Sequence, residues 1–168
     1  MHAPNFQIRD ENEKDEAALS QLSAQAFGPG RFGRTAYRIR EGVAPVSSLA
    51  LTAWLDDRLV GGIRFTAVTI GGEGSALLLG PLVVDPVHKG KGYGKALVAE
   101  GLARAGTQGF RLVVLVGDMP YYGRFGFVPV PPGQIRLPGP VDPARLLALE
   151  LVPGALGSAT GLVQVKAA

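Results

Sequence analysis

The sequence predicts a mixed α/β fold, with a central sheet that is mostly antiparallel and helices on its flanks. Three β-rich runs at residues 49–55, 59–70 and 75–84 follow one another through short turns, which is typical of an antiparallel meander. A helical pattern from residue 92 to residue 106 then separates the third run from a buried-type strand at 111–116. Because a strand–helix–strand connection joins parallel neighbours, we expect one parallel pair in the sheet.

Length and composition indicate one globular domain over residues 1–168, with 46% hydrophobic residues. The 24 glycines and 13 prolines show no period, so they predict tight turns rather than disorder. A net charge of +3 is too small to indicate a nucleic-acid partner. The absence of cysteine excludes disulfides, thiolate metal sites and a cysteine nucleophile. Without a signal sequence or an apolar run of membrane length, we expect a cytoplasmic protein that does not contact membranes.

The N-terminal part predicts a strand, a helix and a basic segment. Residues 6–9 alternate between apolar and polar types, and Asn12 is a suitable N-cap for the helix that follows. That helix is expected to end near Phe27, with one apolar face formed by Ala18, Leu19, Leu22 and Ala26. Four arginines then crowd ten residues: Arg31, Arg34, Arg38 and Arg40. They predict either an exposed basic helix or a lid that faces an acidic substrate or a phosphate.

The C-terminal part predicts short elements. The long helix is expected to end at Gly106, a suitable C′ glycine, and residues 119–125 read as a short helix. A strand is expected at residues 127–130. Two late strands at 146–152 and 162–165 are expected to close one side of a substrate cleft.

The stretch from Leu77 to Leu97 is the most informative part of the chain. An apolar strand is interrupted by Gly80-Pro81, and because proline has no N–H for the ladder, a bulge or a break in pairing is expected there. Asp85-Pro86 ends the strand. Three glycines then alternate with lysines and tyrosine before the long helix begins: Gly90, Gly92 and Gly94. A glycine-rich turn at a helix N-terminus predicts a site for an anion, such as a phosphate.

Two common phosphate motifs do not match this turn. If Gly94-Lys95 is taken as the Gly-Lys of a P-loop, Lys89 stands where the first glycine belongs and Ala96 replaces the serine or threonine. The dinucleotide pattern G-x-G-x-x-G would end on Lys95 or Leu97 instead of glycine.

The segment Lys89-Gly90-Lys91-Gly92-Tyr93-Gly94 resembles instead the [R/Q]-x-x-G-x-[G/A] motif of the GNAT superfamily of N-acetyltransferases. Lys89 is the one departure, and it keeps a hydrogen-bond donor at the first position. A second segment, from Pro120 to Phe127 (PYYGRFGF), resembles the YYxRFGF segment of the same family. The two motifs and the elements between them follow the family's order over roughly 50 residues. The resemblance implies the GNAT fold, in which strands four and five splay apart.

This resemblance also implies a function: direct transfer of an acetyl group from acetyl-CoA to an amine, without a covalent enzyme intermediate and without a metal. The diphosphate of coenzyme A is expected on the backbone of the glycine turn, and the pantetheine amides on the strand that follows Gly80-Pro81. The residues expected to bind the cosubstrate are Leu82, Val83, Val84, Lys89, Gly90, Lys91, Gly92, Tyr93, Gly94 and Lys95.

Tyr122 matches the family tyrosine that lies near the coenzyme A sulfur, and we expect it to act as the general acid on the departing thiolate. Tyr121 is expected to pack in the core, and Arg124 to lie on the helix surface. The general base stays open between Glu73, His88, Asp118 and a water relay. Asp118 is best placed, although it could equally cap the short helix, and His88 is expected to be solvent-exposed.

The acceptor is expected to be a small-molecule or peptide amine, and the protein a monomer or a homodimer. The alternative is a coenzyme A-binding regulatory or sensor domain that has lost turnover.

Overall fold

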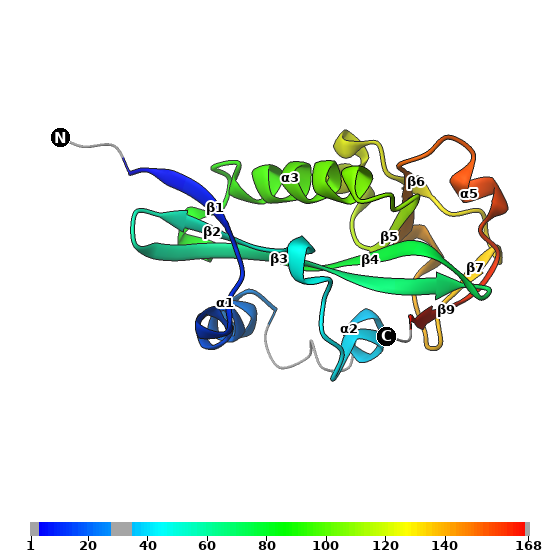
Figure 1. The fold of residues 1–168 in the computed structure, drawn as a ribbon, viewed down its shortest axis with the longest axis horizontal. Coiled ribbons are helices and arrows are strands. Elements are labelled where there is room, and N and C mark those ends of the chain that lie inside the picture. Colours follow the sequence, from blue (N-terminus) through cyan, green and yellow to red (C-terminus); the bar gives the residue numbers. More distant parts are fainter. Residues whose placement is uncertain (1–3, 28–34, 167–168) are drawn as a thin grey trace.

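The structure is a computed structural model that describes residues 4–27 and 35–166. Nine strands of this part of the chain pair in one mixed sheet, with β1-β2-β3-β4-β5-β8-β6 as the main order (Figure 1). Strand β9 pairs with β3 and with the short strand β7. The strands are β1 (Phe6–Asp10), β2 (Ala50–Leu55), β3 (Arg58–Ile70), β4 (Glu73–Val84), β5 (Leu112–Val116), β6 (Val128–Pro129), β7 (Ile135–Arg136), β8 (Leu146–Glu150) and β9 (Gly161–Val165).

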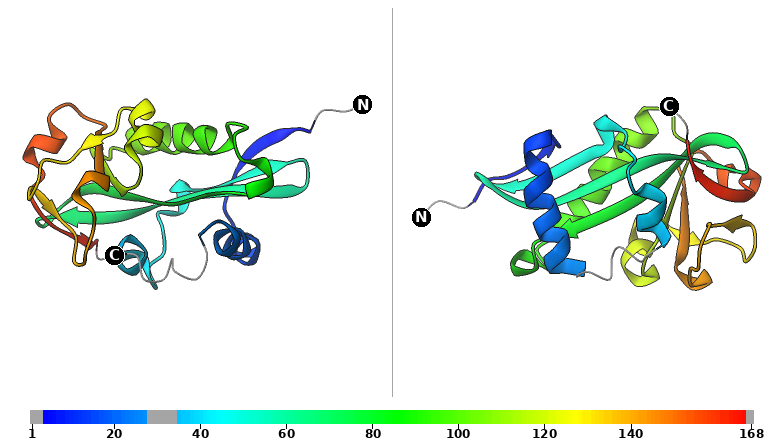
Figure 2. Two further views of the ribbon diagram at one scale, coloured as in Figure 1. Left: turned by 180° about the vertical axis from the view of Figure 1, so that it is seen from behind. Right: turned by 90° about the horizontal axis from the view of Figure 1, so that it is seen from below.

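Helices cover both faces of the sheet. Helix α3 (Tyr93–Thr107) lies along one face, and α1 (Glu16–Phe27) and α2 (Thr35–Arg40) lie across the other (Figures 1 and 2). The short helix α4 (Met119–Tyr122) packs in the same core layer as α3, whereas α5 (Ala155–Ser158) sits near the end of the sheet formed by β7 and β9. We call these the α3 face and the α1/α2 face.

Because successive side chains of a strand point to opposite faces of the sheet, the core is divided into two layers, one on each face. On β3, Ile63 and Phe65 point to the α3 face, while Val68 belongs to the layer on the α1/α2 face with Ile39 of α2. All three strand residues are at most 1% exposed. Leu19 and Leu22 of α1 form a smaller cluster with Val83 of β4.

Strand β4 carries the predicted irregularity. Ile63 pairs with Leu82 and Phe65 pairs with Leu79, so Gly80 and Pro81 together oppose the single residue Arg64. This is a β-bulge, as the Gly80-Pro81 dipeptide predicted.

Beyond the bulge, β4 and β5 separate. Their parallel pairing covers Ala76–Leu112, Leu77–Val113 and Leu78–Val114 and stops there, although β4 continues to Val84. The backbone of Leu82–Val84 is therefore paired with β3 on one side only. The predicted GNAT architecture, with strands four and five splayed, is confirmed.

Several sequence-based expectations about the helices need correction. Helix α3 continues through Gly106 to Thr107, and the left-handed glycine after it is Gly109, with φ +88°. On α1 only Leu19 and Leu22 of the predicted apolar face are buried, and Ala18 and Ala26 are exposed. The cap at Asn12 is confirmed: its side chain accepts from the Lys14 N–H, and Asp15 completes a capping box.

The C-terminal strands differ in length from the prediction: β8 ends at Glu150 instead of residue 152, whereas β9 begins one residue earlier than expected, at Gly161. The strand predicted at 127–130 has only two paired residues, Val128 and Pro129, since a proline-rich turn follows it. Strand β7 and helix α5 were not predicted, because a two-residue strand and a four-residue helix carry too little periodicity.

Candidate active site

The glycine turn leads into α3 in the expected geometry. Gly90 and Gly92 have φ values of +82° and +85°, and Gly92 is the N-cap of α3. A Cβ atom at either position would meet nothing within 4 Å, so the backbone of the turn is open to an approaching group. The first N–H groups of a helix lack intrahelical partners, and the helix dipole favours an anion at this end. The turn is therefore suited to a phosphate.

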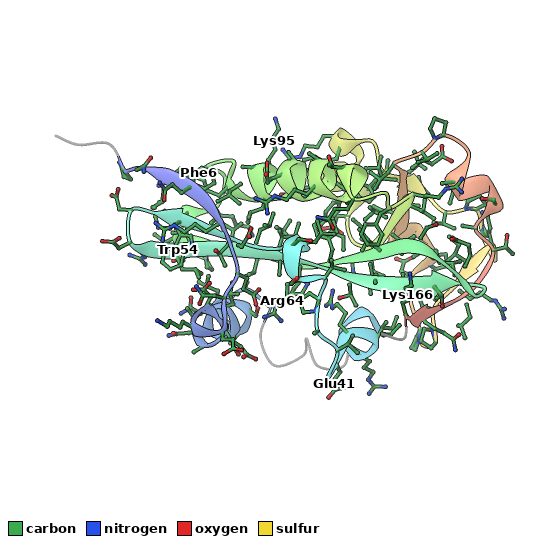
Figure 3. The ribbon with its side chains drawn as sticks, in the orientation of Figure 1. Phe6, Glu41, Trp54, Arg64, Lys95 and Lys166 are labelled. Atoms are coloured by element: carbon green, nitrogen blue, oxygen red, sulfur yellow. The ribbon has the colours of Figure 1, made fainter. Side chains whose placement is uncertain are left out.

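The charged side chains of the turn lie at the surface. Lys89, Lys91 and Lys95 are all exposed. Figure 3 shows Lys95 directed away from the sheet, on the outer side of α3. Tyr93 points inward instead, with its ring stacked on Phe6 at 4.8 Å. Tyr93, which was expected to bind the cosubstrate, therefore also packs against the first strand of the sheet.

Tyr121 lies closer to the turn than the sequence suggested. Its hydroxyl is 2.7 Å from where a Cβ of Gly94 would stand, and side-chain atoms of Val84 and Leu82 lie 3.4 and 3.9 Å from the same point. The Tyr121 hydroxyl therefore sits between the first turn of α3 and the unpaired end of β4. The expectation that Tyr121 only packs in the core is incomplete.

Arg124 fixes the ring of Tyr121. The guanidinium lies 4.3 Å from the ring centroid, and its Nε donates to the Tyr121 carbonyl at 3.0 Å. Arg124 is exposed, as expected for the helix surface. Burial raises the pKa of the Tyr121 hydroxyl, and the charge of Arg124 counteracts that rise.

Tyr122 points in another direction from the same short helix. Its ring packs against Gly117, where a Cβ would lie 2.5 Å from Cε2, and against Phe127 with a centroid separation of 5.8 Å. Burial raises the pKa of Tyr122 to about 12, with further contributions from Tyr121 and Asp118, while Arg145 and Arg40 lower it. The hydroxyl is thus fully protonated at neutral pH and can donate a proton.

Arg40 reaches the same region from the opposite face of the sheet. It is the last residue of α2, and its guanidinium occupies the space where a Cβ of Gly80 would be. Gly80 has φ +138°, a conformation that favours glycine. The charge of Arg40 also lowers the pKa of the Tyr122 hydroxyl, against the larger effect of burial.

The three candidate bases are placed very differently. Asp118 pairs with Arg145 (Oδ1 to Nε, 3.3 Å), and its side chain is 74% exposed. It occupies the N-cap position of α4 without a capping hydrogen bond. Its charge acts on the Tyr122 hydroxyl, so Asp118 is the one of the three that belongs to this region.

Glu73 lies at the far end of β4, where its carboxylate accepts from the backbone N–H and the hydroxyl of Ser75. Seven residues of extended strand separate it from Gly80, or about 23 Å at about 3.3 Å per residue. That distance excludes Glu73 as a base at the bulge. His88 was expected to be exposed, but both imidazole nitrogens are shielded and have no hydrogen-bond partner among the described residues.

A charged pair on the α1/α2 face was not recognised in the sequence. Arg64 donates to both carboxylate oxygens of Glu11, at 2.8 and 2.6 Å, and Arg64 is the residue opposite the bulge. Figure 3 shows Arg64 beneath the sheet, between α1 and α2. Fifty-three residues separate the partners, so no local pattern signals the pair. Of the arginine cluster, Arg31 and Arg34 lie outside the described residues, and Arg38 is exposed.

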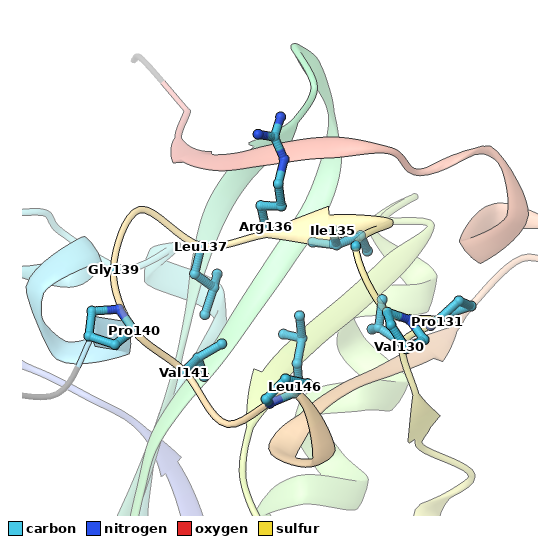
Figure 4. A pocket seen from close by; sticks show the side chains of 12 residues that line it. Val130, Pro131, Ile135, Arg136, Leu137, Gly139, Pro140, Val141 and Leu146 are labelled. Atoms are coloured by element: carbon cyan, nitrogen blue, oxygen red, sulfur yellow. The ribbon is translucent and has the colours of Figure 1, made fainter.

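An open pocket of about 320 Å³ lies beside β7 and the turn before β8. Its wall is mostly apolar and rich in proline. In Figure 4, Leu137, Val141 and Leu146 point toward one another across the hollow, while Arg136 points away from it. Val130, Ile135 and Leu146 of its wall belong to the core layer on the α1/α2 face, whereas Tyr122 packs in the layer on the α3 face.

The residues present fit acetyl-CoA. The turn at Gly90–Lys95 offers an open backbone at a helix N-terminus, and the unpaired side of Leu82–Val84 offers backbone groups in a gap between strands. The Tyr121 hydroxyl lies beside this segment, and the ring of Tyr122 is 4.9 Å from that of Tyr121. Within residues 4–27 and 35–166, no three His, Asp or Glu side chains gather closely enough to hold a metal ion.

A splayed sheet, a glycine turn at a helix N-terminus and a short helix with two adjacent tyrosines occur together in this chain. Comparison with known proteins shows which family of proteins the chain belongs to. Residues 17–127 match the model of the acetyltransferase (GNAT) family, and the chain belongs to that family. Members of the family transfer acetyl groups to amine acceptors.

Among curated proteins, the chain is 30% identical over 159 residues to the uncharacterized N-acetyltransferase YhbS of Escherichia coli K12, covering 94% of each chain. It is also 30% identical over 132 residues to the uncharacterized N-acetyltransferase YjhQ of the same organism, covering 77% of this chain and 72% of YjhQ.

Two solved structures are similar over nearly the whole chain. Escherichia coli YhbS in complex with CoA gives a TM-score of 0.83 at 28% identity, covering 99% of this chain and 92% of YhbS. A GNAT acetyltransferase from Brucella melitensis in complex with acetyl-CoA gives 0.72 at 30% identity, covering 97% of each chain. No helix in the described part of the chain is long and apolar enough to cross a membrane.

Proposed function

We propose that this protein transfers an acetyl group from acetyl-CoA directly to an amine. The observation that carries the proposal is the meeting of three features at one place. The open glycine turn and the unpaired end of β4 flank a gap, and the two tyrosines of α4 adjoin it: the Tyr121 hydroxyl lies beside that end of β4, and the Tyr122 ring is 4.9 Å from the Tyr121 ring. The similar structures from Escherichia coli and Brucella melitensis, which contain CoA and acetyl-CoA, support this assignment.

Each part of the site has a role in the proposal. Backbone N–H groups of residues 90–95 hold the diphosphate, with Lys89 and Lys91 near it. The unpaired backbone of Leu82–Val84 pairs with the pantetheine amides, and one N–H of this segment can donate to the thioester oxygen, which is typically worth about 3 kcal/mol. Bound acetyl-CoA supplies the activated acyl group.

Tyr122 donates its proton to the departing thiolate. Because its pKa is about 12, the hydroxyl still carries this proton near pH 10, where an amine acceptor is deprotonated in appreciable amounts. The proton of the acceptor amine passes to solvent through water, since Glu73 is remote and the carboxylate of Asp118 is paired with Arg145. The proposal keeps the cytoplasmic location expected from the sequence.

The decisive experiment combines binding and turnover. Calorimetry with acetyl-CoA measures binding, and a thiol reagent then measures release of free CoA across a library of amines. Binding with acceptor-dependent thiol release supports the transferase. Binding without thiol release for any amine would favour the regulatory or sensor domain, and the absence of binding would contradict both.

A further inference from the structure

The Tyr121 hydroxyl lies where the glycine turn and the gap beside β4 meet. It is 2.7 Å from the position that a Cβ of Gly94 would take, in the first turn of α3. Side-chain atoms of Val84 and Leu82, from the end of β4 that is paired on one side only, lie 3.4 and 3.9 Å from the same position. A ligand that extends from the turn to this end of β4 therefore passes beside the hydroxyl.

Gly94 is a glycine for a different reason from Gly90 and Gly92. Those two have positive φ values and open space around them, whereas Gly94 is a buried residue within α3 and has no positive φ. Alanine would be the better helix former at this position. Its Cβ, however, would overlap the Tyr121 hydroxyl at 2.7 Å. The missing side chain of Gly94 thus leaves the space that the hydroxyl fills.

The surroundings of this hydroxyl leave its proton for an acceptor on a ligand. The nearby side-chain atoms of Val84 and Leu82 are carbons, and the guanidinium of Arg124, 4.3 Å from the ring centroid, can only donate hydrogen bonds. Arg124 also fixes the residue, because its Nε donates to the Tyr121 carbonyl at 3.0 Å. Burial raises the pKa of the hydroxyl, so it is protonated at neutral pH. A fixed phenol with a cation beside it is suited to a phosphate oxygen.

We propose that Tyr121 is a cosubstrate-binding residue, and that its hydroxyl donates a hydrogen bond to the phosphate of coenzyme A nearest to the pantetheine arm. The inference rests on the function proposed above, because the diphosphate on the turn and the pantetheine on β4 bring this phosphate to the hydroxyl. Tyr121 and Tyr122 then have separate roles. Tyr121 binds the cosubstrate equally in the ground state and the transition state, and Tyr122 acts only as the thiolate departs.

Removing the two hydroxyl groups one at a time tests this assignment. Tyr121→Phe should weaken calorimetric binding of CoA about 10- to 100-fold, the range for a hydrogen bond to a charged group. It should raise the KM for acetyl-CoA and leave kcat nearly unchanged, because uniform binding is lost. Tyr122→Phe is the matched control, and its affinity for CoA should stay near that of the wild type.

A shorter ligand locates the contact on coenzyme A. The nucleotide half, 3′-phospho-ADP, contains the same phosphate without the pantetheine arm, so Tyr121→Phe should weaken its binding by a similar factor. Unchanged CoA affinity in Tyr121→Phe would overturn the inference. A loss confined to CoA would overturn it too, because the hydroxyl would then contact the pantetheine arm and not the phosphate.

A double-mutant cycle with Gly94 tests the position of the hydroxyl independently. Gly94→Ala should displace the hydroxyl, and should therefore weaken CoA binding and lower the Tm of the ligand-free protein. In Tyr121→Phe the overlapping atom is absent, so there Gly94→Ala should cause little further loss of affinity and should not lower the Tm. Additive losses of affinity would show that the hydroxyl does not act from beside Gly94, and would refute the inference.

The proposal about Tyr121 and the transferase proposal fail in different ways. If the wild type binds CoA but acetylates no amine, only the transferase proposal fails, because the calorimetric tests of Tyr121 need no turnover. If acceptor-dependent thiol release is normal but Tyr121→Phe and Tyr122→Phe lose CoA affinity equally, only the role of Tyr121 is refuted. A wild type that binds neither CoA nor 3′-phospho-ADP would refute both.

Discussion

The two tyrosines of α4 show how much one position along a helix changes a side chain's role. Successive residues of a helix point about 100° apart, so neighbouring side chains cannot face the same space. Tyr121 directs its hydroxyl to the first turn of α3, and Tyr122 packs its ring on Gly117. The centroids of the two rings are only 4.9 Å apart, yet of the two hydroxyl groups only that of Tyr122 has its pKa lowered by the charge of Arg40.

Replacing Tyr122 by phenylalanine tests its role as the general acid. The ring and its packing remain, and only the proton is removed. We expect kcat to fall about 10²- to 10⁴-fold with little change in affinity for acetyl-CoA, because the lost interaction exists only as the thiolate departs. Tyr121→Phe is the matched control and should lose much less in kcat. Near-normal turnover in Tyr122→Phe, together with a large loss in Tyr121→Phe, would show that the roles are exchanged.

The pKa of Tyr122 can be measured directly by absorbance titration near 295 nm. We expect the step at the highest pH, around 12, to disappear in Tyr122→Phe. The raised pKa also affects stability. An unfolded tyrosine ionises near pH 10, so above that pH the unfolded state loses a proton that the folded state keeps.

Stability should therefore fall between pH 10 and pH 12, and by pH 11.5 this group should have cost about 2 kcal/mol. Urea denaturation at pH 9 and pH 11.5 measures the loss in the wild type and in Tyr122→Phe. The variant should lose about 2 kcal/mol less than the wild type. Equal losses would mean that Tyr122 ionises normally in the folded protein.

At the scale of elements, the glycine turn has a matched control elsewhere in the chain. Gly92 and Gly154 both cap the N-terminus of a helix, with φ, ψ values of +85°, 8° and +88°, −6°, and both have open space around them. Valine at either position should cost similar backbone strain, about 1–2 kcal/mol. Only Gly92→Val should also block the approach of the diphosphate, so acetyl-CoA affinity should fall severely there and stay normal in Gly154→Val. Unchanged calorimetric affinity in a folded Gly92→Val protein would contradict the phosphate site.

Helix α3 offers a second matched pair, which tests how it packs on the sheet. A Cβ at Gly101 would overlap the ring of the fully buried Phe65, with Cζ at 2.7 Å, whereas a Cβ at Gly106 would meet nothing within 4 Å. Gly101→Ala should destabilise the protein by about 1–3 kcal/mol through overpacking. Gly106→Ala should stabilise it by up to about 1 kcal/mol through helix propensity. Thermal unfolding of the two variants measures both, and a stabilised Gly101→Ala would mean that α3 moves freely on β3.

Elements whose signals are local were predictable from the sequence, and contacts between distant segments were not. The cap at Asn12, the bulge at Gly80-Pro81 and the glycine turn each depend on a few neighbouring residues. The Glu11–Arg64 pair and the contact of Arg40 with Gly80 join segments about 40 residues or more apart, so only the folded sheet reveals them. His88 also differs from the prediction: the residue is partly buried, and both imidazole nitrogens are shielded in the folded chain.

At the scale of the whole molecule, the sheet is divided by the gap that begins after Leu78 and Val114. On the far side of the bulge, β4 remains attached to β3, and β5 pairs with β8. The two parts are held together by the three β4–β5 pairs, by the pairing of β9 with Val68–Ile70 of β3, and by α3 and the core beneath it. A ligand that fills the gap should therefore join them.

Hydrogen exchange with two ligands can separate filling of the gap from binding at the turn. Coenzyme A should protect the amides of both the turn at residues 90–95 and the segment Leu82–Val84. Its nucleotide half, 3′-phospho-ADP, should protect the turn alone, because it lacks the pantetheine arm. At 100 times its Kd, coenzyme A adds about 2.7 kcal/mol of stability, which for a chain of this size raises the Tm by about 5–10 °C. If 3′-phospho-ADP protected Leu82–Val84 as well as coenzyme A does, the gap would close from a distance, and the backbone of β4 would not be the pantetheine site.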